Sequence, residues 1–160
     1  MVGMVQEAKQ VSDIVVLCLH AGGQFNSTVG RYTKHLYELA ARAGANLIVG
    51  NHAHTILPAY MEGQCIVFPA LGNFSFTPEE GYYVDNTYAD YSLLLHVDVY
   101  NGKIVSLSHE LCVCSKHKGF GVTLPVGDLP CASLTEKVKS EIFAVSQKVN
   151  SSIQGLNIIS

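Results

Sequence analysis

Two apolar segments, each ending beside a histidine, constrain the fold of this 160-residue chain more than any other feature. Residues 13–20 read DIVVLCLH, and residues 46–54 read NLIVGNHAH. Between them, apolar side chains recur at helical spacing over 32–43 and stop at Gly44, a residue type that commonly ends helices. A strand, a helix and a second strand in this order predict a right-handed βαβ unit with parallel strands. We expect the first strand to be covered on both faces, because its apolar residues are continuous rather than alternating.

The histidines of these segments are the strongest candidates for chemistry. Parallel strands bring their carboxyl ends to one edge of a sheet, which is where open α/β sheets bind ligands. His20, His52 and His54 should therefore meet at this edge. Neutral imidazole is a favoured ligand for zinc, iron and similar metals. An isolated His-x-His pair is more often bonded to backbone or water, because two ligands do not complete a metal site, but a third histidine at the same edge favours a metal centre.

The chain changes character in its second half, where paired apolar segments flank short polar turns. This pattern predicts antiparallel hairpins. The hairpins are expected over 57–61 with 65–69 and over 91–99 with 103–113.

Apolar residues alternate along both strands of the later hairpin and determine how its side chains face. The alternation requires odd-numbered residues to oppose odd-numbered residues, which a two-residue Asn-Gly loop would prevent. We therefore expect a three-residue loop over 100–102, with Gly102 in the left-handed conformation and Leu95 opposite Leu107. In this register His96 and His109 lie on opposite faces, as structural or surface residues.

The remainder of the chain contains one clear element. Residues 114–132 hold glycine, proline and lysine without a period and predict an irregular segment. Residues 133–150 open with a capping box from Ser133 to Glu136 and continue as one apolar stripe, which predicts a C-terminal helix from about residue 134. Residues 151–160 are expected to form a tail.

Composition limits the classes of function. Of the residues, 48% are hydrophobic and 14% are charged, and the formal net charge is -3, which suits one globular body without the basic face that nucleic-acid binding requires. No apolar run is long enough to span a bilayer, and the N-terminal residues lack the pattern of a secretory signal. Five cysteines at unrelated spacings are expected to be free and structural, with Cys18 and Cys65 packed inside apolar strands.

Three motifs occur in the order and spacing of a known family. Residues 13–25, DIVVLCLHAGGQF, resemble a strand that ends in His-Trp-Gly-x-Glu-Tyr. Residues 44–54, GANLIVGNHAH, resemble Gly-Ala-Asp-Leu-Val-Ile-Gly-His-His-Pro-His, and residues 70–76, ALGNFSF, resemble Ser-Leu-Gly-Asn-Phe-Val-Phe. These are motifs of the CapA-like family of poly-γ-glutamate capsule-synthesis proteins, in the calcineurin-like metallophosphoesterase superfamily. The resemblance covers residues 1–113, which look like the C-terminal half of such a domain.

The resemblance implies a fold, a metal centre and a set of site residues. The implied fold is α/β, a partial calcineurin-like α-β-β-α sandwich in which a parallel βαβ unit precedes antiparallel hairpins and a C-terminal helix. The implied centre holds two divalent transition metals (manganese, iron or zinc), with His20 and His52 on one ion and His54 on the other. The implied substrate is anionic, and the location suggested by the family is the cell envelope. The residues expected to bind the substrate are Asn51, Gln24 and Asn73.

The chain also departs from the family's motifs. Gln24 replaces an acidic residue and Asn51 replaces a histidine, and the family's carboxylate ligands come from segments N-terminal to the matching region. Three neutral histidines alone should bind metal weakly. We therefore expect either the missing N-terminal half of the domain or self-association to complete the site. The further carboxylates to consider are Asp85, Asp90 and Asp98, of which only Asp85 lies in a coil long enough to reach the site.

Two functions from different classes are compatible with these residues. One is a metal-dependent hydrolase of the phosphoesterase type, linked to capsule synthesis. The other is a non-catalytic accessory to capsule polymer export or synthesis, in which the same crevice binds an anionic polymer. The first requires stoichiometric transition metal and the second does not. A truncated chain without function is a third interpretation of the same residues.

Overall fold

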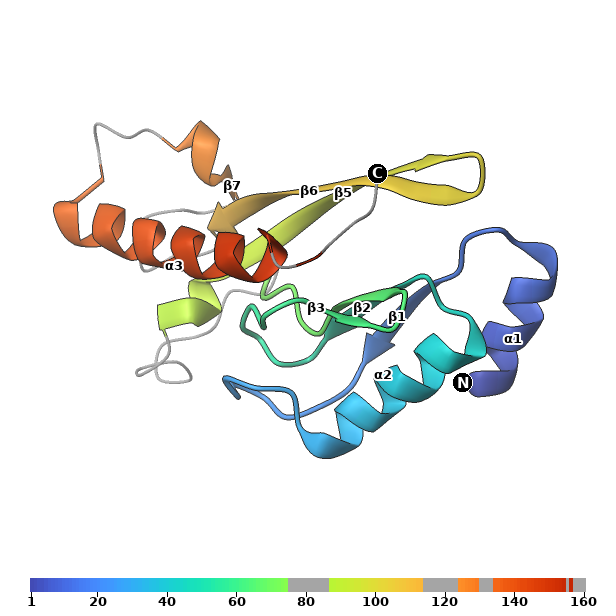
Figure 1. Ribbon diagram of the computed structural model, residues 1–160. Coiled ribbons are helices and arrows are strands. Elements are labelled where there is room, and N and C mark those ends of the chain that lie inside the picture. Colours follow the sequence, from blue (N-terminus) through green and yellow to red (C-terminus); the bar gives the residue numbers. More distant parts are fainter. Residues whose placement is uncertain (75–86, 114–123, 130–133, 155, 157–160) are drawn as a thin grey trace.

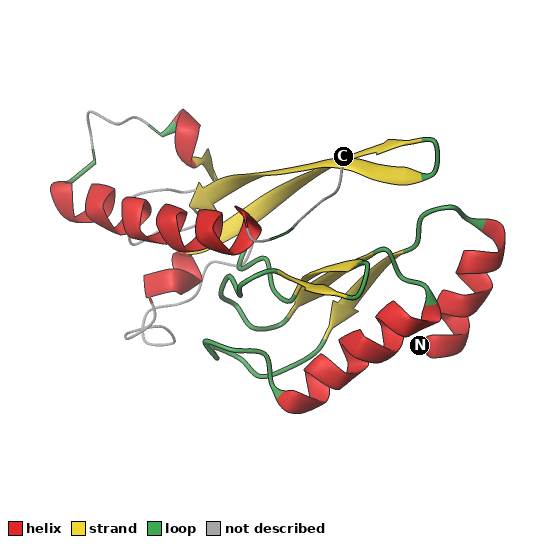
Figure 2. Ribbon diagram, viewed as in Figure 1, coloured by secondary structure: helices red, strands yellow, loops and turns green. Residues whose placement is uncertain are grey.

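The computed structural model describes residues 1–74, 87–113, 124–129, 134–154 and 156, and it shows a mixed α/β fold (Figure 1). Figure 2 shows two groups of strands, each with helices packed beside it. The expected fold class is confirmed, because a sheet with parallel strands, an antiparallel hairpin and a C-terminal helix are all present. Within the described residues, no helix combines the length and apolarity that crossing a membrane requires.

The N-terminal part contains the expected βαβ unit, preceded by one helix. Its strands are parallel, with Val16 opposite Leu47 and His20 opposite Asn51. The helix between them ends at Gly44, whose φ of 112° is left-handed and favours glycine. The elements are α1 (Val2–Val11), β1 (Val16–His20), α2 (Arg31–Ala43) and β2 (Leu47–Asn51).

Two further strands, β3 (Tyr60–Glu62) and β4 (Cys65–Phe68), form the first expected hairpin and join the same sheet. Strand β4 runs antiparallel to β3 and parallel to β2. The order in the sheet is therefore β1-β2-β4-β3, with β1 at one edge.

The expectation that β1 is covered on both faces is wrong. Leu17 and Leu19 pack against the core beneath α2, but Val16 on the other face is 49% exposed and Cys18 is also exposed. The reason is the strand order, because the layer that covers β2 and β4 does not extend over the edge strand. Cys18 is therefore free as expected, but it does not pack as a core residue.

The other cysteines of the described residues follow the expectation. Cys65 and Cys112 are free and buried. Cys114 and Cys131 lie outside the residues that the structure describes.

The second sheet contains the later hairpin, and its predicted register is wrong. Val99 pairs with Ile104 and Tyr100 pairs with Lys103, so the loop has two residues, Asn101 and Gly102, with φ of 47° and 69°. Gly102 has the expected left-handed conformation, but in a two-residue turn. This sheet consists of β5 (Tyr91–Tyr100), β6 (Lys103–Val113) and β7 (Leu124–Pro125), with short 3-10 turns η1 (Thr87–Asp90) and η2 (Val126–Asp128) at its end.

A β-bulge reconciles the alternating apolar residues of β5 and β6 with a two-residue turn. The register shifts between Asp98 and Val99, so that Val105 is an additional residue on β6. Beyond the bulge, odd residues oppose odd residues as predicted, but Leu95 pairs with His109 instead of Leu107. The additional residue lies in the strand rather than in the loop.

The C-terminal helix α3 (Glu136–Gln154) begins two residues later than predicted. The Thr135 hydroxyl accepts a hydrogen bond from the Val138 N–H at 3.3 Å and caps the helix. Ser133, the expected cap, lies outside the described residues. The helix continues beyond the expected end at residue 150.

Packing places α1 and α2 against one face of the first sheet and the β5–β6 hairpin against its other face (Figure 1). Adjacent residues of β2 face opposite layers: Ile48 packs in the core shared with α1 and α2, and Leu47 packs in the core between the two sheets. Further along the same face of the hairpin, α3 contributes Val145 and Val149 to a third core that contains Leu93 and Leu111. The carboxyl ends of β1 and β2 lie side by side at one end of the first sheet.

Candidate metal centre

The ends of β1 and β2 bring His20 and His52 into contact. His20 is the last residue of β1, and His52 directly follows β2. The Nε2 atom of His20 lies 2.9 Å from the Nδ1 atom of His52, and the ring centroids are 4.8 Å apart. The contact lies on the surface, where a ligand from solvent can reach both rings.

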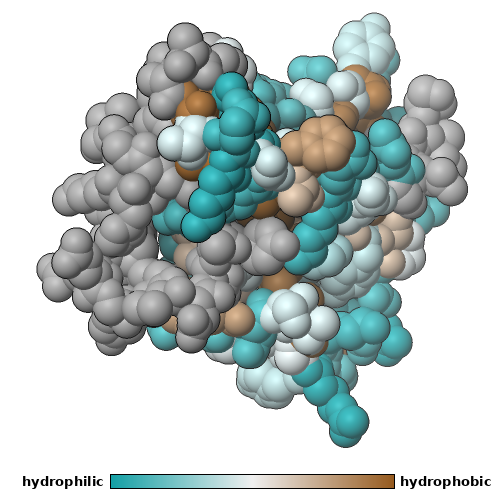
Figure 3. Space-filling model, turned by 90° about the vertical axis from the view of Figure 1, so that its left-hand side faces the viewer, coloured by the Kyte–Doolittle hydropathy of each residue, from teal (hydrophilic) through white to brown (hydrophobic). Residues whose placement is uncertain are grey.

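The third histidine lies beside this pair. The ring centroids of His52 and His54 are 6.2 Å apart, so the structure gathers all three histidines at one sheet edge, as the sequence predicted. Figure 3 views the molecule from the end at which β1 and β2 finish, where hydrophilic and near-neutral side chains cover much of the lower part of the described surface. The binding of metal by these histidines stays a prediction.

The backbone of the histidine turn is held in an uncommon conformation. The backbone φ is 94° at His52 and 57° at His54. Both values are positive, a range that residues other than glycine rarely adopt. Such conformations cost about 1–3 kcal/mol each and persist where the surroundings impose them, often at functional sites. The residues between and after the histidines, Ala53 and Thr55, are buried and anchor the turn. The N–H of Phe25 donates to the Ala53 carbonyl at 2.8 Å, which joins the turn to the loop after β1.

Asn73 and Phe25 surround the ring of His54. Asn73 Oδ1 lies 2.8 Å from His54 Nδ1, and Asn73 Nδ2 donates to the carbonyl oxygens of His54 at 3.3 Å and Ala89 at 3.0 Å. The ring of Phe25 stacks on that of His54, with centroids 5.3 Å apart and an interplanar angle of 20°. Sequence reasoning assigned no role to Phe25, although the residue occupies the aromatic position of the His-Trp-Gly-x-Glu-Tyr motif.

Gly50 allows the C-terminal end of β2 to lie against the segment that leads to Asn73. A Cβ atom at Gly50 would collide with the Pro69 carbonyl oxygen and the Tyr37 hydroxyl. These two groups are themselves joined, because the Tyr37 hydroxyl donates to the Pro69 carbonyl at 3.1 Å. Only glycine fits this contact, which fixes where the histidine turn begins.

The other expected substrate-binding residues occupy different surroundings. Gln24 is exposed in the loop after β1. Asn51 is half-buried at the end of β2, and it lines a largely apolar groove of about 400 Å³ between the two sheets. Asn73 is only 4% exposed. Its side chain therefore faces His54 rather than solvent.

The histidine nitrogens fit a metal ion in part. Two nitrogens that each bind one ion at about 2.1 Å and an angle of about 90° are separated by about 3 Å. The 2.9 Å between His20 Nε2 and His52 Nδ1 is a hydrogen bond in this structure, and its length is also close to the separation of such a pair of ligands. Across the part of the chain that the structure describes, no group of three or more histidine, cysteine or acidic side chains is placed to hold one ion.

The aspartates considered from the sequence do not complete this pair in the described structure. Asp90 ends η1, and Asp98 pairs with Ser106 near the turn of the later hairpin. Asp85 lies outside the described residues.

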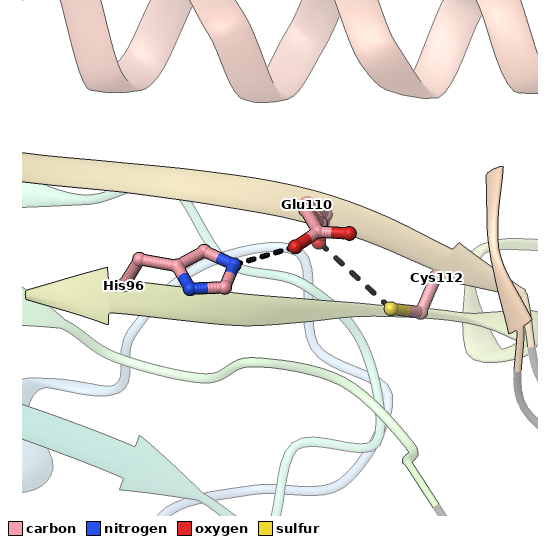
Figure 4. A network of polar contacts seen from close by, with 3 residues as sticks. All are labelled: His96, Glu110 and Cys112. Atoms are coloured by element: carbon pink, nitrogen blue, oxygen red, sulfur yellow. Dashed lines mark hydrogen bonds and ion pairs between the residues drawn. The ribbon is translucent and has the colours of Figure 1, made fainter. Parts of the chain in front are cut away.

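Two further histidines, on the hairpin, lie on opposite faces as predicted. His96 Nε2 and Glu110 Oε1 are 2.6 Å apart on neighbouring strands (Figure 4). Both side chains are about half exposed, and such surface pairs contribute about 0–1 kcal/mol to stability. His109 Nε2 lies 3.1 Å from Asn150 Oδ1 of α3. These contacts are structural and separate from the candidate metal centre.

Comparisons with known proteins agree with the motifs of the N-terminal part. Residues 1–78 match the family described as bacterial capsule synthesis protein PGA_cap. The PGA biosynthesis protein CapA of Bacillus subtilis (strain 168) is 36% identical over 73 residues, which are 46% of this chain and 19% of that protein. The capsule biosynthesis protein CapA of Bacillus anthracis is 34% identical over 65 residues, 41% of this chain and 16% of that protein.

The matched part spans less than a fifth of either relative. It contains β1, α2, β2 and all three histidines of the candidate centre. The wider resemblance, over 79–113, stays a prediction. Residues 1–78 therefore resemble the bacterial capsule synthesis protein family and are CapA-like in sequence.

Proposed function

We propose that this chain carries the histidine part of a metal-dependent, phosphoesterase-type hydrolase site that acts in poly-γ-glutamate capsule synthesis. The observation that carries the proposal is the approach of His20 Nε2 to His52 Nδ1 at 2.9 Å, with His54 beside them. The capsule role follows from the relatives, whose names assign them to capsule and PGA biosynthesis.

Each histidine has a separate task in this proposal. His20 Nε2 and His52 Nδ1 hold one divalent ion, and the adjacent ring of His54 holds a second. Two such ions lower the pKa of water and stabilise negative charge on a reacting phosphate or carboxylate. The strained turn supports the site by keeping His52 and His54 on the same side of the β2 end.

Further polypeptide completes the site. Three neutral imidazoles do not offset the charge of two divalent ions, and carboxylates are the ligands that do so. The open edge of β1, with Val16 and Cys18 exposed, is a surface on which an additional strand can pair. The added polypeptide is either the N-terminal half of the domain or a second copy of this chain.

Metal titration tests the histidine roles. Isothermal titration with zinc or manganese should detect weak binding to the chain, and His20→Ala or His52→Ala should lower the affinity about tenfold or more. His35→Ala is the matched control, because His35 lies exposed on α2 and contacts Glu38 at 3.5 Å. Equal affinity in the wild type and both site variants would contradict the metal centre.

A complementation assay tests catalysis. The part of the Bacillus subtilis relative that precedes its 73 matched residues is added to the chain, and turnover of a generic phosphodiester is followed with manganese. We expect turnover only when both polypeptides and metal are present. Binding of polyglutamate that persists in a chelator, without turnover, would instead support the non-catalytic accessory.

A further inference from the structure

We propose that Asn73 is a positioning residue that holds His54 in the tautomer protonated on Nδ1, with the lone pair on Nε2. The importance of this for metal binding rests on the proposed function, but the tautomer itself does not. The inference also changes the expected role of Asn73 from substrate binding to orientation of a ligand.

The hydrogen bonds of Asn73 determine which way its amide points. Its Nδ2 atom lies 3.3 Å from the His54 carbonyl oxygen and 3.0 Å from the Ala89 carbonyl oxygen. A carbonyl oxygen can only accept, so the group facing these two oxygens must be the NH2 group. The remaining atom, Oδ1, therefore faces the ring of His54. This arrangement resolves the usual ambiguity between the oxygen and nitrogen of an asparagine.

The amide orientation then determines the protonation of the ring. Asn73 Oδ1 is an acceptor only, and it lies 2.8 Å from His54 Nδ1, so that nitrogen must donate a proton. In a neutral imidazole protonated on Nδ1, the lone pair is on Nε2. Metal-binding histidines are commonly oriented by such a bond from the other ring nitrogen to an oxygen.

The two histidines of the His-x-His turn therefore present different nitrogens. His52 directs Nδ1 toward His20, whereas His54 has its Nδ1 committed to Asn73. His54 would bind an ion through Nε2. This difference explains how residues only two apart can serve separate ions.

Asn73 is also placed to hold His54 rigidly. It is 4% exposed and bonds both the ring and the backbone carbonyl of His54. Its third bond, to Ala89, connects the site to η1. The stacked ring of Phe25 restricts rotation of the imidazole from another side. One buried side chain thus fixes the backbone, the tautomer and the ring direction of His54.

The test is NMR of the histidine ring nitrogens in the metal-free chain, at a pH where His54 is neutral. His54→Gln identifies the His54 signals. We expect the wild type to show His54 protonated on Nδ1, Asn73→Leu to shift it toward the Nε2-protonated form, and Asn73→Asp, which keeps the acceptor, to retain Nδ1 protonation. A wild-type ring protonated on Nε2, or an unchanged tautomer in Asn73→Leu, would overturn the proposal.

Two further measurements separate the possible failures. Thermal unfolding reports whether Asn73→Leu remains folded; if it does not, the wild-type tautomer and the Asn73→Asp variant still decide the proposal. Zinc titration of the folded variants should show about 10–100-fold weaker binding at one site in Asn73→Leu and partial recovery in Asn73→Asp. A tautomer that changes as expected without any change in zinc affinity would leave the hydrogen-bonding role of Asn73 intact and contradict the proposed second ion at His54.

Discussion

His20 and His52 are 32 residues apart in the sequence, yet their side-chain nitrogens lie 2.9 Å apart. The parallel pairing of β1 with β2 produces this contact, because it puts His20 opposite Asn51, the residue that precedes His52. The relationship makes the two imidazoles a single unit, which can be tested separately from His54.

A double-mutant cycle should show that His20 and His52 share one ion. Once either histidine is replaced by alanine, replacing the other should cost little further zinc affinity, because the shared site is already lost. The expected coupling between them is about 0.5–3 kcal/mol, measured by titration calorimetry. His20→Ala combined with His54→Ala should be closer to additive. Additive losses for His20 and His52 would mean that they do not bind the same ion.

Gly50→Ala should destabilise the chain and disturb the site. The new Cβ atom would collide with the Pro69 carbonyl and the Tyr37 hydroxyl, both held by their own hydrogen bond. Overpacking of this kind costs about 1–3 kcal/mol, and denaturant unfolding should show it as a lower midpoint. Gly3→Ala is the control, because nothing lies within 4 Å of its Cβ position and alanine favours the α1 helix by up to about 1 kcal/mol. Equal stability of Gly50→Ala and the wild type would show that β2 can move away from Pro69.

The βαβ unit and the grouping of its histidines could be predicted from sequence because each follows from local patterns. Continuous apolar runs, a helical stripe and Gly44 define the elements, and parallel strands must end at one edge. The exposure of Cys18 could not be predicted in this way. It depends on β1 being an edge strand, which is decided by where β4 and the hairpin pack.

The hairpin register and the His54 contacts show two further limits of sequence reasoning. Alternating apolar residues require one additional residue somewhere in the hairpin, but they do not say whether it lies in the loop or, as found, at Val105. The contact between His54 and Asn73 joins residues 19 apart through a buried side chain. The Leu-Gly-Asn-Phe motif marked Asn73 as important without showing which atom it faces.

Cys18 should be the most reactive cysteine among those the structure describes. It is exposed on β1, whereas Cys65 and Cys112 are buried. In a background with Cys114 and Cys131 replaced by serine, maleimide labelling followed by mass spectrometry should show one rapid phase, and Cys18→Ser should remove it. Addition of the polypeptide that completes the site should slow this phase, because a strand paired with β1 restricts access. Labelling of Cys18 as slow as that of Cys65 in the dilute chain would mean that β1 is already covered, as self-association would cause.

The chain should lose stability between about pH 9 and pH 12, in part because of Cys65. Burial raises the pKa of the Cys65 thiol from 9.0 to about 12, with a smaller contribution from the charge of Glu62. The neutral thiol is the favoured form in the folded state, so its contribution is fully present below pH 9 and is lost as the pH rises through the folded pKa. Each group of this kind makes the stability fall by at most about 1.4 kcal/mol per pH unit in that interval.

Cys65→Ala should therefore reduce the stability at pH 7, through lost packing, but make its decline above pH 9 less steep. Urea unfolding measured at intervals from pH 7 to pH 11 gives both quantities. Part of the decline should remain in the variant, because the pKa of Tyr60 is also raised to about 12, mainly by burial. Tyr60→Phe should remove that remaining part. An identical pH profile for the wild type and Cys65→Ala would show that the thiol ionises as readily in the folded chain as in the unfolded one, contrary to its buried position on β4.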